Sequence, residues 1–165
     1  MKTVGAFLFY FFLVTNLYSQ VNTERFRIAT DSLGFSCRAG LDMILMKGNT
    51  DFIFLGTNSR LNYNWGEDYI FLVFNGGFGE NNGKSFFSQA LMHLRNVTSI
   101  NDFLQVEEFI QYNNDKQLLL LNRTLAGVGF RYKLISNKET VLRLGTSAFF
   151  EHESYDLPLF SFHSN

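Results

Sequence analysis

Apolar and polar residues alternate along seven successive segments of the sequence, and this alternation limits the possible folds more than any other feature. In residues 52–64, Ile53 and Leu61 fall in one phase of the alternation, whereas Arg60 and Asn62 fall in the other. A period of two residues is the period of a β-strand, whose successive side chains point to opposite faces of a sheet. We therefore expect an all-β protein whose sheet has one apolar and one polar face.

The seven segments are bounded by clusters of Gly, Asn, Asp and Lys, which favour turns. The expected strands are residues 34–46, 52–64, 69–79, 85–97, 103–113, 117–134 and 140–151. Because only short connections separate them, consecutive strands are expected to pair as an antiparallel up-and-down meander over residues 34–155. The one proline of the chain is Pro158. Its position agrees with an uninterrupted meander, because proline removes a ladder hydrogen bond.

The length of the strands indicates what the apolar face contacts. Strands of soluble proteins usually have about 5–6 residues, whereas a tilted strand needs about 9–11 residues to cross a membrane. The expected strands reach the second length. The polar face also carries charged side chains in mid-strand, which a narrow barrel lumen can hold. We therefore expect a transmembrane outer-membrane β-barrel with lipid against its apolar face.

Aromatic residues near the expected strand ends agree with the aromatic girdles of membrane barrels. They are Tyr63, Trp65, Tyr69, Tyr112, Tyr132 and Phe150. Glu108 is an exception to the pattern, because it falls in the apolar phase in mid-strand. A carboxylate facing lipid costs up to about 2 kcal/mol at the midplane and less near the interface. Glu108 is therefore expected near the rim, unless the register slips there.

The N-terminus has the pattern of a cleaved secretory signal peptide over residues 1–19. Lys2 precedes an apolar run at 4–14, and Ser19 supplies a small residue at the cut site. The run is too short for a spanning helix, which needs about 17–25 residues. Residues 20–33 are expected to form a lead-in to the sheet, and residues 156–165 an irregular tail.

Composition and spacing give no sign of catalysis or of a cofactor. The formal net charge of −1 excludes a strongly basic nucleic-acid surface, and a single cysteine, Cys37, excludes an internal disulfide. The three histidines are too far apart in the sequence to indicate a metal site, and no motif marks an activated serine. We expect no catalytic residue, no metal and no cofactor.

The polar phase instead predicts a network of charged and amide side chains in the lumen. His93 and Arg95 are expected to form hydrogen bonds with Glu107 and Gln111 of the next expected strand, because a narrow lumen lets such groups pair. The candidate network consists of Arg60, His93, Arg95, Glu107, Gln111, Arg123 and Arg131.

Several segments together resemble a known family. They are KGNTD (47–51), RLNY (60–63), HLR (93–95), EEFIQ (107–111), NRTLAGVGFRYKL (122–134) and GTSAFFE (145–151). In this order and spacing they resemble the family called domain of unknown function 481, whose members are often labelled salt-induced outer-membrane proteins. The resemblance spans roughly residues 34–153, and RTLAGVGFRY (123–132) is its most specific part. It implies an outer-membrane β-barrel without an established activity.

The expected function is that of a non-enzymatic barrel of the bacterial envelope, related to envelope or salt stress. Outer-membrane lipids and the barrel-assembly machinery are the expected partners. A small porin and a periplasmic lipocalin-like ligand binder are the alternatives, and a barrel-embedded lipid hydrolase is the weakest. Seven strands are fewer than the eight of the smallest bacterial barrels. Residues 159–163 could supply an eighth strand, and the sequence otherwise has the pattern of a truncated product.

Overall fold

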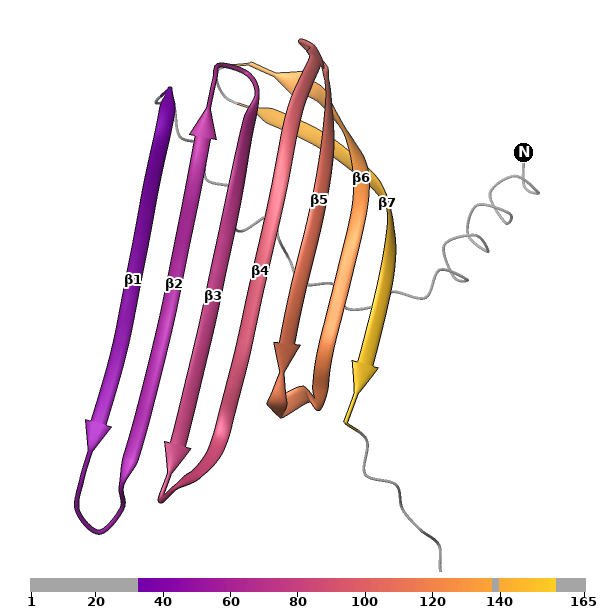
Figure 1. Cartoon of the computed structure of the whole chain (residues 1–165). Coiled ribbons are helices and arrows are strands. Elements are labelled where there is room, and N and C mark those ends of the chain that lie inside the picture. Colours follow the sequence, from indigo (N-terminus) through magenta and orange to yellow (C-terminus); the bar gives the residue numbers. More distant parts are fainter. Residues whose placement is uncertain (1–32, 138–139, 157–165) are drawn as a thin grey trace, which may run out of the picture.

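A computed structural model describes residues 33–137 and 140–156 of the chain. These residues form one sheet of seven strands (Figure 1). The elements are β1 (Gly34–Met46), β2 (Phe52–Asn64), β3 (Tyr69–Asn81), β4 (Lys84–Asn101), β5 (Leu104–Asp115), the single 3-10 turn η2 (Lys116–Leu118), β6 (Leu120–Ser136) and β7 (Val141–Tyr155).

The strands follow one another across the sheet in chain order, and each pairs antiparallel with its sequence neighbour. The predicted all-β antiparallel meander is thus confirmed. The predicted closed barrel is not what the structure shows, because β1 and β7 are the two edges of an open sheet in its described part. An antiparallel meander of seven strands sends β1 and β7 in the same direction, so an antiparallel bond between them is impossible.

The strand ends differ from the predicted ones where short turns are tighter than expected. β1 and β2 begin and end at the predicted residues, but β3 and β4 extend to Asn81 and Lys84. Asn82 and Gly83 alone connect them, with φ of 49° and 75°. Asn-Gly favours such positive φ values, and two-residue turns of this kind match the twist of a hairpin. The predicted connection at residues 80–84 was therefore too long.

β6 begins later than predicted because the chain first forms η2. The Asp115 side chain accepts hydrogen bonds from the backbone N–H groups of Gln117 and Leu118, at 2.9 and 3.3 Å. Leu119 then adopts a left-handed conformation with φ of 55°. An aspartate that caps a turn in this way competes with strand formation, so the strand starts at Leu120 and not at residue 117.

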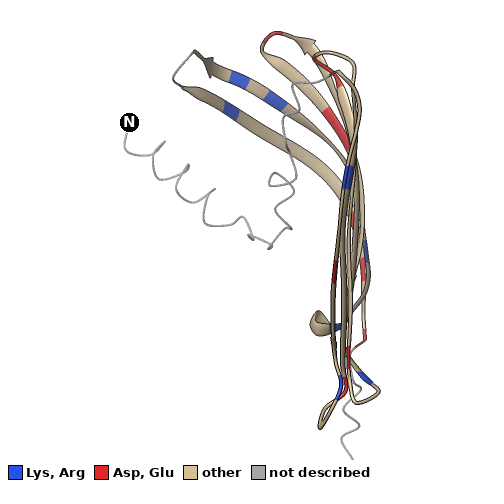
Figure 2. Ribbon diagram, turned by 90° about the vertical axis from the view of Figure 1, so that its left-hand side faces the viewer, with Lys and Arg blue, Asp and Glu red and all other residues tan. Residues whose placement is uncertain are grey.

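The sheet is curved, and its polar face is the concave one. Figure 2 shows β6 and β7 swinging to one side of the plane of the other strands. On that side, Glu67 from the β2–β3 connection and Arg143 from β7 line one pocket, although three strands separate β3 from β7. Arg143 pairs with Lys133 in the polar phase of β6. The polar side chains therefore face the inside of the curve.

Burial on the two faces is the reverse of that in a soluble protein. On the concave face, Asn62, His93, Arg95 and Gln111 are buried, with His93 only 1% exposed. On the convex face of the same inner strands, large apolar side chains are exposed, and Ile110, for example, is 49% exposed. Charged and amide residues are seldom buried in soluble proteins, and large contiguous exposed apolar surfaces mark sites that contact another protein, a membrane or a ligand.

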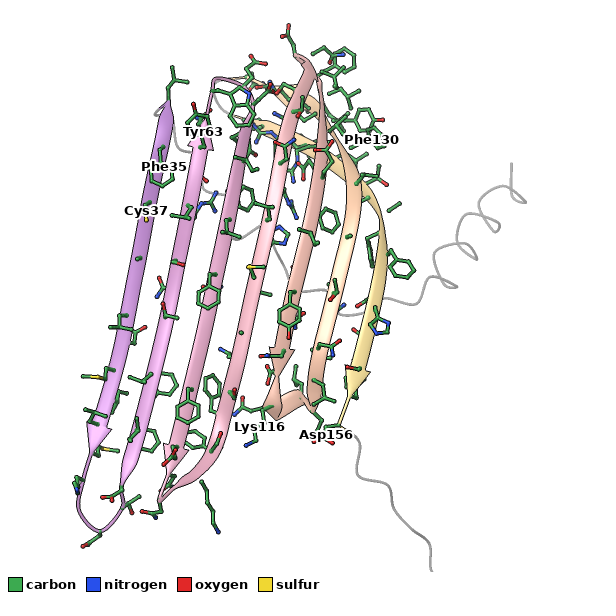
Figure 3. The ribbon with its side chains drawn as sticks, viewed as in Figure 1. Phe35, Cys37, Tyr63, Lys116, Phe130 and Asp156 are labelled. Atoms are coloured by element: carbon green, nitrogen blue, oxygen red, sulfur yellow. The ribbon has the colours of Figure 1, made fainter. Side chains whose placement is uncertain are left out.

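The aromatic residues form less of a girdle than the sequence predicted. Tyr63 does lie at one end of the sheet (Figure 3), and its ring centroid is 5.6 Å from that of Trp65. Tyr69 instead stacks on Phe71, which is buried. Phe150 lies five residues before the end of β7, because this strand continues to Tyr155. Position near a predicted strand end was therefore not enough to place Tyr69 and Phe150 in a girdle. A girdle residue must also lie on the convex face, and the strand must end where it was predicted to end.

Three of the predicted segments fall largely or wholly outside the described residues. They are the signal peptide at 1–19, the lead-in at 20–33 and the tail at 156–165, which includes the suggested strand at 159–163. Among the described residues, no helix is both long enough and apolar enough to cross a membrane.

Candidate functional site

A histidine and an arginine two residues apart on β4 form the centre of the concave face. His93 is paired across the sheet with Gln111 of β5, and its Nδ1 lies 3.1 Å from the Gln111 Oε1. Arg95 Nε donates to His93 Nε2 at 3.2 Å. Since a guanidinium only donates, Nε2 must accept, and the ring hydrogen is on Nδ1. The geometry therefore selects one neutral tautomer, whose Nδ1–H donates to the amide oxygen of Gln111.

Glu107 connects three strands through its two carboxylate oxygens. Its Oε2 accepts from Arg95 Nη1 at 3.0 Å, and its Oε1 accepts from Arg131 Nε at 2.9 Å. The carboxylate is buried, with its side chain 9% exposed. Hydrogen bonds between ionised groups are stronger than neutral ones, and a buried charge without a partner is strongly destabilising. One carboxylate thus holds β4 and β6 to β5.

Aromatic rings cover the network on two sides. The His93 ring lies between Phe71 and Phe109, at centroid distances of 5.9 and 6.1 Å. The guanidinium of Arg60 lies 4.4 Å above the Phe71 ring, and that of Arg95 lies 5.4 Å from the Phe109 ring. Cations over ring faces are attracted by the ring quadrupole. The charged groups are therefore held between apolar rings as well as by hydrogen bonds.

Gly127 of β6 makes room for the aromatic side of the network. It pairs with Phe109 on one side and with Phe149 on the other. A Cβ atom at this position would lie 2.6 Å from the backbone oxygen of Ala148 and 2.7 Å from Cζ of Phe109. The backbone oxygen cannot swing away as a side chain can, so this position requires glycine.

The structure gathers five of the seven predicted network residues, which are His93, Arg95, Glu107, Gln111 and Arg131. The other two lie beside this group. Arg60 donates through Nε and Nη2 to Asn62 Oδ1 and contacts the group through Phe71. Arg123 lies in a separate cluster with Glu151 and Glu153 of β7.

Sequence reasoning missed the rings of Phe71 and Phe109. Phe109 falls in the same phase as Glu107 and Gln111, which could have placed it on the polar face. Phe71 lies in a segment that is apolar on both faces, so alternation could not assign it. Its place became evident only from the pairing of Phe71 with Arg95.

The side chains of the network connect neighbouring strands to one another. Its imidazole, carboxylate and guanidinium groups are bonded to one another. Among residues 33–137 and 140–156, no three His, Cys, Asp or Glu side chains are grouped as a metal site would require.

Two pockets lie near the opposite ends of the sheet. One, of about 170 Å³, lies where the β2–β3 and β4–β5 connections approach β6 and β7. The other, of about 300 Å³, adjoins η2 and is lined by Lys116 and Asp156, which Figure 3 shows at the far end from Tyr63.

The fold and the concave network define a class of protein: a curved, single-sheet β-meander with a charged, buried inner face and an exposed apolar outer face. A family model narrows this class. The chain belongs to the family described as "Protein of unknown function, DUF481", whose model matches residues 38–157. This match confirms the resemblance found in the sequence. Neither a curated protein nor a solved structure matches the chain.

Proposed function

We propose that the protein is a non-enzymatic β-barrel of the bacterial outer membrane, in which the convex face contacts lipid. The observation that carries this proposal is the reversed burial of the two faces within β4 and β5: Met92 and Ile110 are 47% and 49% exposed, whereas His93 and Glu107 are buried. In water, the apolar convex surface of all seven strands would be exposed to solvent, whereas in a membrane lipid would cover it.

The lengths of the strands support the same proposal. They run from 12 residues in β5 to 18 in β4, and a tilted strand needs about 9–11 residues to cross the hydrocarbon core. Each strand is thus long enough to cross and to extend beyond the membrane surface. A periplasmic lipocalin-like binder would need the apolar side chains on the concave side, where they could line a cavity.

Closure of the barrel requires strands beyond the seven described. Lipid tolerates no unpaired sheet edge, and β1 and β7 are both edges. Because these strands run in the same direction, an antiparallel closure takes an odd number of additional strands and gives an even total, as in bacterial barrels.

The concave network supports a filled lumen over an open channel. Glu107 and its arginine partners connect β4, β5 and β6, and the rings of Phe71 and Phe109 pack against them. In narrow barrels, side chains of this size fill the interior. The protein would therefore contribute to the envelope as a structural element and not as a pore.

The test is fractionation of bacteria that express the full chain, with alkaline extraction of the membranes. We expect the protein in the outer membrane after extraction, with faster gel mobility in unheated than in heated samples. Recovery in the soluble periplasm would contradict the proposal. The variant Arg123→Leu, which breaks the ion pairs with Glu151 and Glu153, should lower the temperature at which the mobility changes. An unchanged temperature would show that these ion pairs do not stabilise the protein.

A further inference from the structure

The end of the concave face that adjoins β6 and β7 carries an unusual arrangement of positive charge. Lys133 of β6 and Arg143 of β7 are direct partners across the sheet, and Arg131 lies two residues from Lys133 on the same face. Figure 2 shows basic residues gathered on this hairpin, which swings away from the other strands. Like charges directly opposite each other on a sheet are destabilising.

Lys133 and Arg143 form no direct ion pair within the described part of the chain. Arg131 has Glu107 as a partner at 2.9 Å, but Lys133 and Arg143 have no carboxylate within ion-pairing distance among residues 33–137 and 140–156. Both side chains are exposed. Two adjacent cations that repel each other and lack a partner form a site that an anion would stabilise.

A pocket lies at this position. Its volume is about 170 Å³, and Arg131, Lys133 and Arg143 line it on the side of β6 and β7. Polar side chains of β4 and β5 line it as well; Gln105 Nε2 donates to Ser99 Oγ at 3.2 Å, which fixes both. The pocket is smaller than the 300–1,000 Å³ or so that drug-sized ligands occupy, and it suits a small ion or a headgroup.

The strands are irregular at the same place. The pairing of β6 and β7 shifts by one residue between Lys133 and Ile135. An extra residue in one strand re-aims the side chains on either side of it, and such bulges are frequent beside binding sites. Here the shift lies next to Lys133, so the bulge affects how the side chains of Lys133 and Arg143 are placed.

We propose that this pocket binds a phosphate group through Lys133, Arg143 and Arg131. Arginine and lysine are the side chains that bind phosphate best, arginine through two parallel N–H donors and lysine as a point charge. Two carboxylates, Glu67 and Asp102, line the same pocket from the β2–β3 and β4–β5 connections. A carboxylate repels a fully ionised oxyanion but accepts a hydrogen bond from a protonated phosphate oxygen.

The acidic side of the pocket therefore distinguishes phosphate from sulfate. Phosphate carries a proton near neutral pH, whereas sulfate carries none, so only phosphate can donate to Glu67 or Asp102. Phosphate is expected to bind more tightly than sulfate although the two ions are similar in shape and charge. A buried or partly buried polar group that lacks its partner is the usual source of such discrimination.

The chain contains its own reporter for a binding experiment. Its single tryptophan, Trp65, belongs to the same connection as Glu67, and its backbone N–H donates to the Asp68 carbonyl at 3.1 Å. The full chain is refolded in micelles of a zwitterionic detergent and titrated with potassium phosphate, with potassium sulfate and with potassium chloride at constant ionic strength. Tryptophan fluorescence and calorimetry follow binding.

The test variant is Lys133→Ala with Arg143→Ala, which leaves Arg131 and its bond to Glu107 in place. The control variant is Lys47→Ala with Lys84→Ala, which removes the same charge from the opposite end of the sheet. We expect saturable phosphate binding, at least about tenfold weaker in the test variant and unchanged in the control, which corresponds to 1.4 kcal/mol or more. Sulfate should bind more weakly than phosphate, and chloride should give no saturation.

A second titration distinguishes a lipid headgroup from free phosphate as the ligand. Micelles that contain a small fraction of an anionic phospholipid with a phosphomonoester headgroup, which can still carry a proton near neutral pH, replace the free ion. Saturation with this lipid alone, lost in the test variant, would assign the pocket to a lipid headgroup; saturation with free phosphate would assign it to a solute. The proposal is overturned if neither probe saturates, or if the test variant binds like the wild-type chain. These outcomes are independent of membrane fractionation, so the proposed function is tested separately.

Discussion

Glu107 and Glu108 are neighbours in β5, yet their side chains lie in opposite environments. Glu107 is buried on the concave face, where Arg95 and Arg131 both donate to it. Glu108 is exposed on the convex face, where the Asn96 amide donates to it at 2.8 Å. One peptide bond separates a carboxylate paired with two cations from a carboxylate paired with a neutral amide.

The two faces of the sheet differ in the partners that they offer to a charged side chain. The concave face compensates ionised groups with opposite charges and with aromatic rings, and it buries them. The convex face is apolar, and its one charged residue in the middle of β5 is accompanied only by Asn96 and by Thr98, which accepts from Asn96 at 3.3 Å. Substitutions on the two faces should therefore have different effects on stability, and these effects test the proposed contact of the convex side with lipid.

The largest effect is expected from Glu107→Gln. The neutral amide leaves the guanidiniums of Arg95 and Arg131 buried without their negative partner, which typically lowers the free energy of unfolding by about 3–5 kcal/mol. Urea unfolding of the chain refolded in lipid vesicles, followed by Trp65 fluorescence, measures it.

The matched control is Glu108→Gln, one residue away. Glutamine keeps an oxygen for the Asn96 amide and removes a charge from the convex face, so stability should be unchanged or should rise, by no more than about 2 kcal/mol. Equal losses for the two variants would show that the faces do not differ in the proposed way.

A second test places a charge on the convex face at two depths. Met92 is at the middle of β4 and Ile53 is next to the start of β2, and both are exposed. If the face contacts lipid, Met92→Lys should destabilise the protein by about 2–4 kcal/mol and Ile53→Lys by about 0–1 kcal/mol. If the face contacts water, both changes should stay within about 0.5 kcal/mol. Folding from urea into vesicles distinguishes the two cases.

A third test concerns the packing of the concave face. Gly127→Ala should lower stability by about 1–3 kcal/mol, because its Cβ would meet the Ala148 carbonyl and overpacking of this kind strains the backbone. Gly145→Ala is the control in the neighbouring strand, since only a backbone oxygen at 4.0 Å lies near its Cβ. The temperature of the change in gel mobility should fall for Gly127→Ala and stay the same for Gly145→Ala.

The last and smallest expected effect is a change in the rate at which Cys37 is chemically modified, and it is measured on the unsubstituted protein. Cys37 is the one cysteine of the chain, and it is exposed on the convex face of β1 (Figure 3). A water-soluble maleimide should modify it slowly in vesicles and quickly after unfolding in urea, because lipid excludes both the reagent and the reactive thiolate. Fast modification in intact vesicles would place water at the convex face.

The sequence predicted the features that depend on local alternation. The faces of β1 and β2 and the bounds of both strands follow from a period of two residues, and so does the position of Arg95 beside Glu107. What it could not predict depends on the turns and on distant pairing. Asp115 formed a capped turn where a strand was expected, and Arg123 paired with glutamates of β7 because register brings them together. The burial of Phe71 could not be predicted either, because its segment is apolar in both phases. Its pairing with Arg95 of β4 places it on the concave face.

The odd number of described strands also has a consequence for sidedness. β1 starts at the end of the sheet where the phosphate pocket lies, and β7 finishes at the end near η2 (Figure 1). If all seven strands cross the membrane, Gly34 and Tyr155 face different compartments. A protease or an epitope antibody that cannot cross the membrane should then reach a tag inserted before β1 or one inserted after β7 in intact cells, but never both. Whichever tag is reached identifies the compartment from which the pocket receives its ligand.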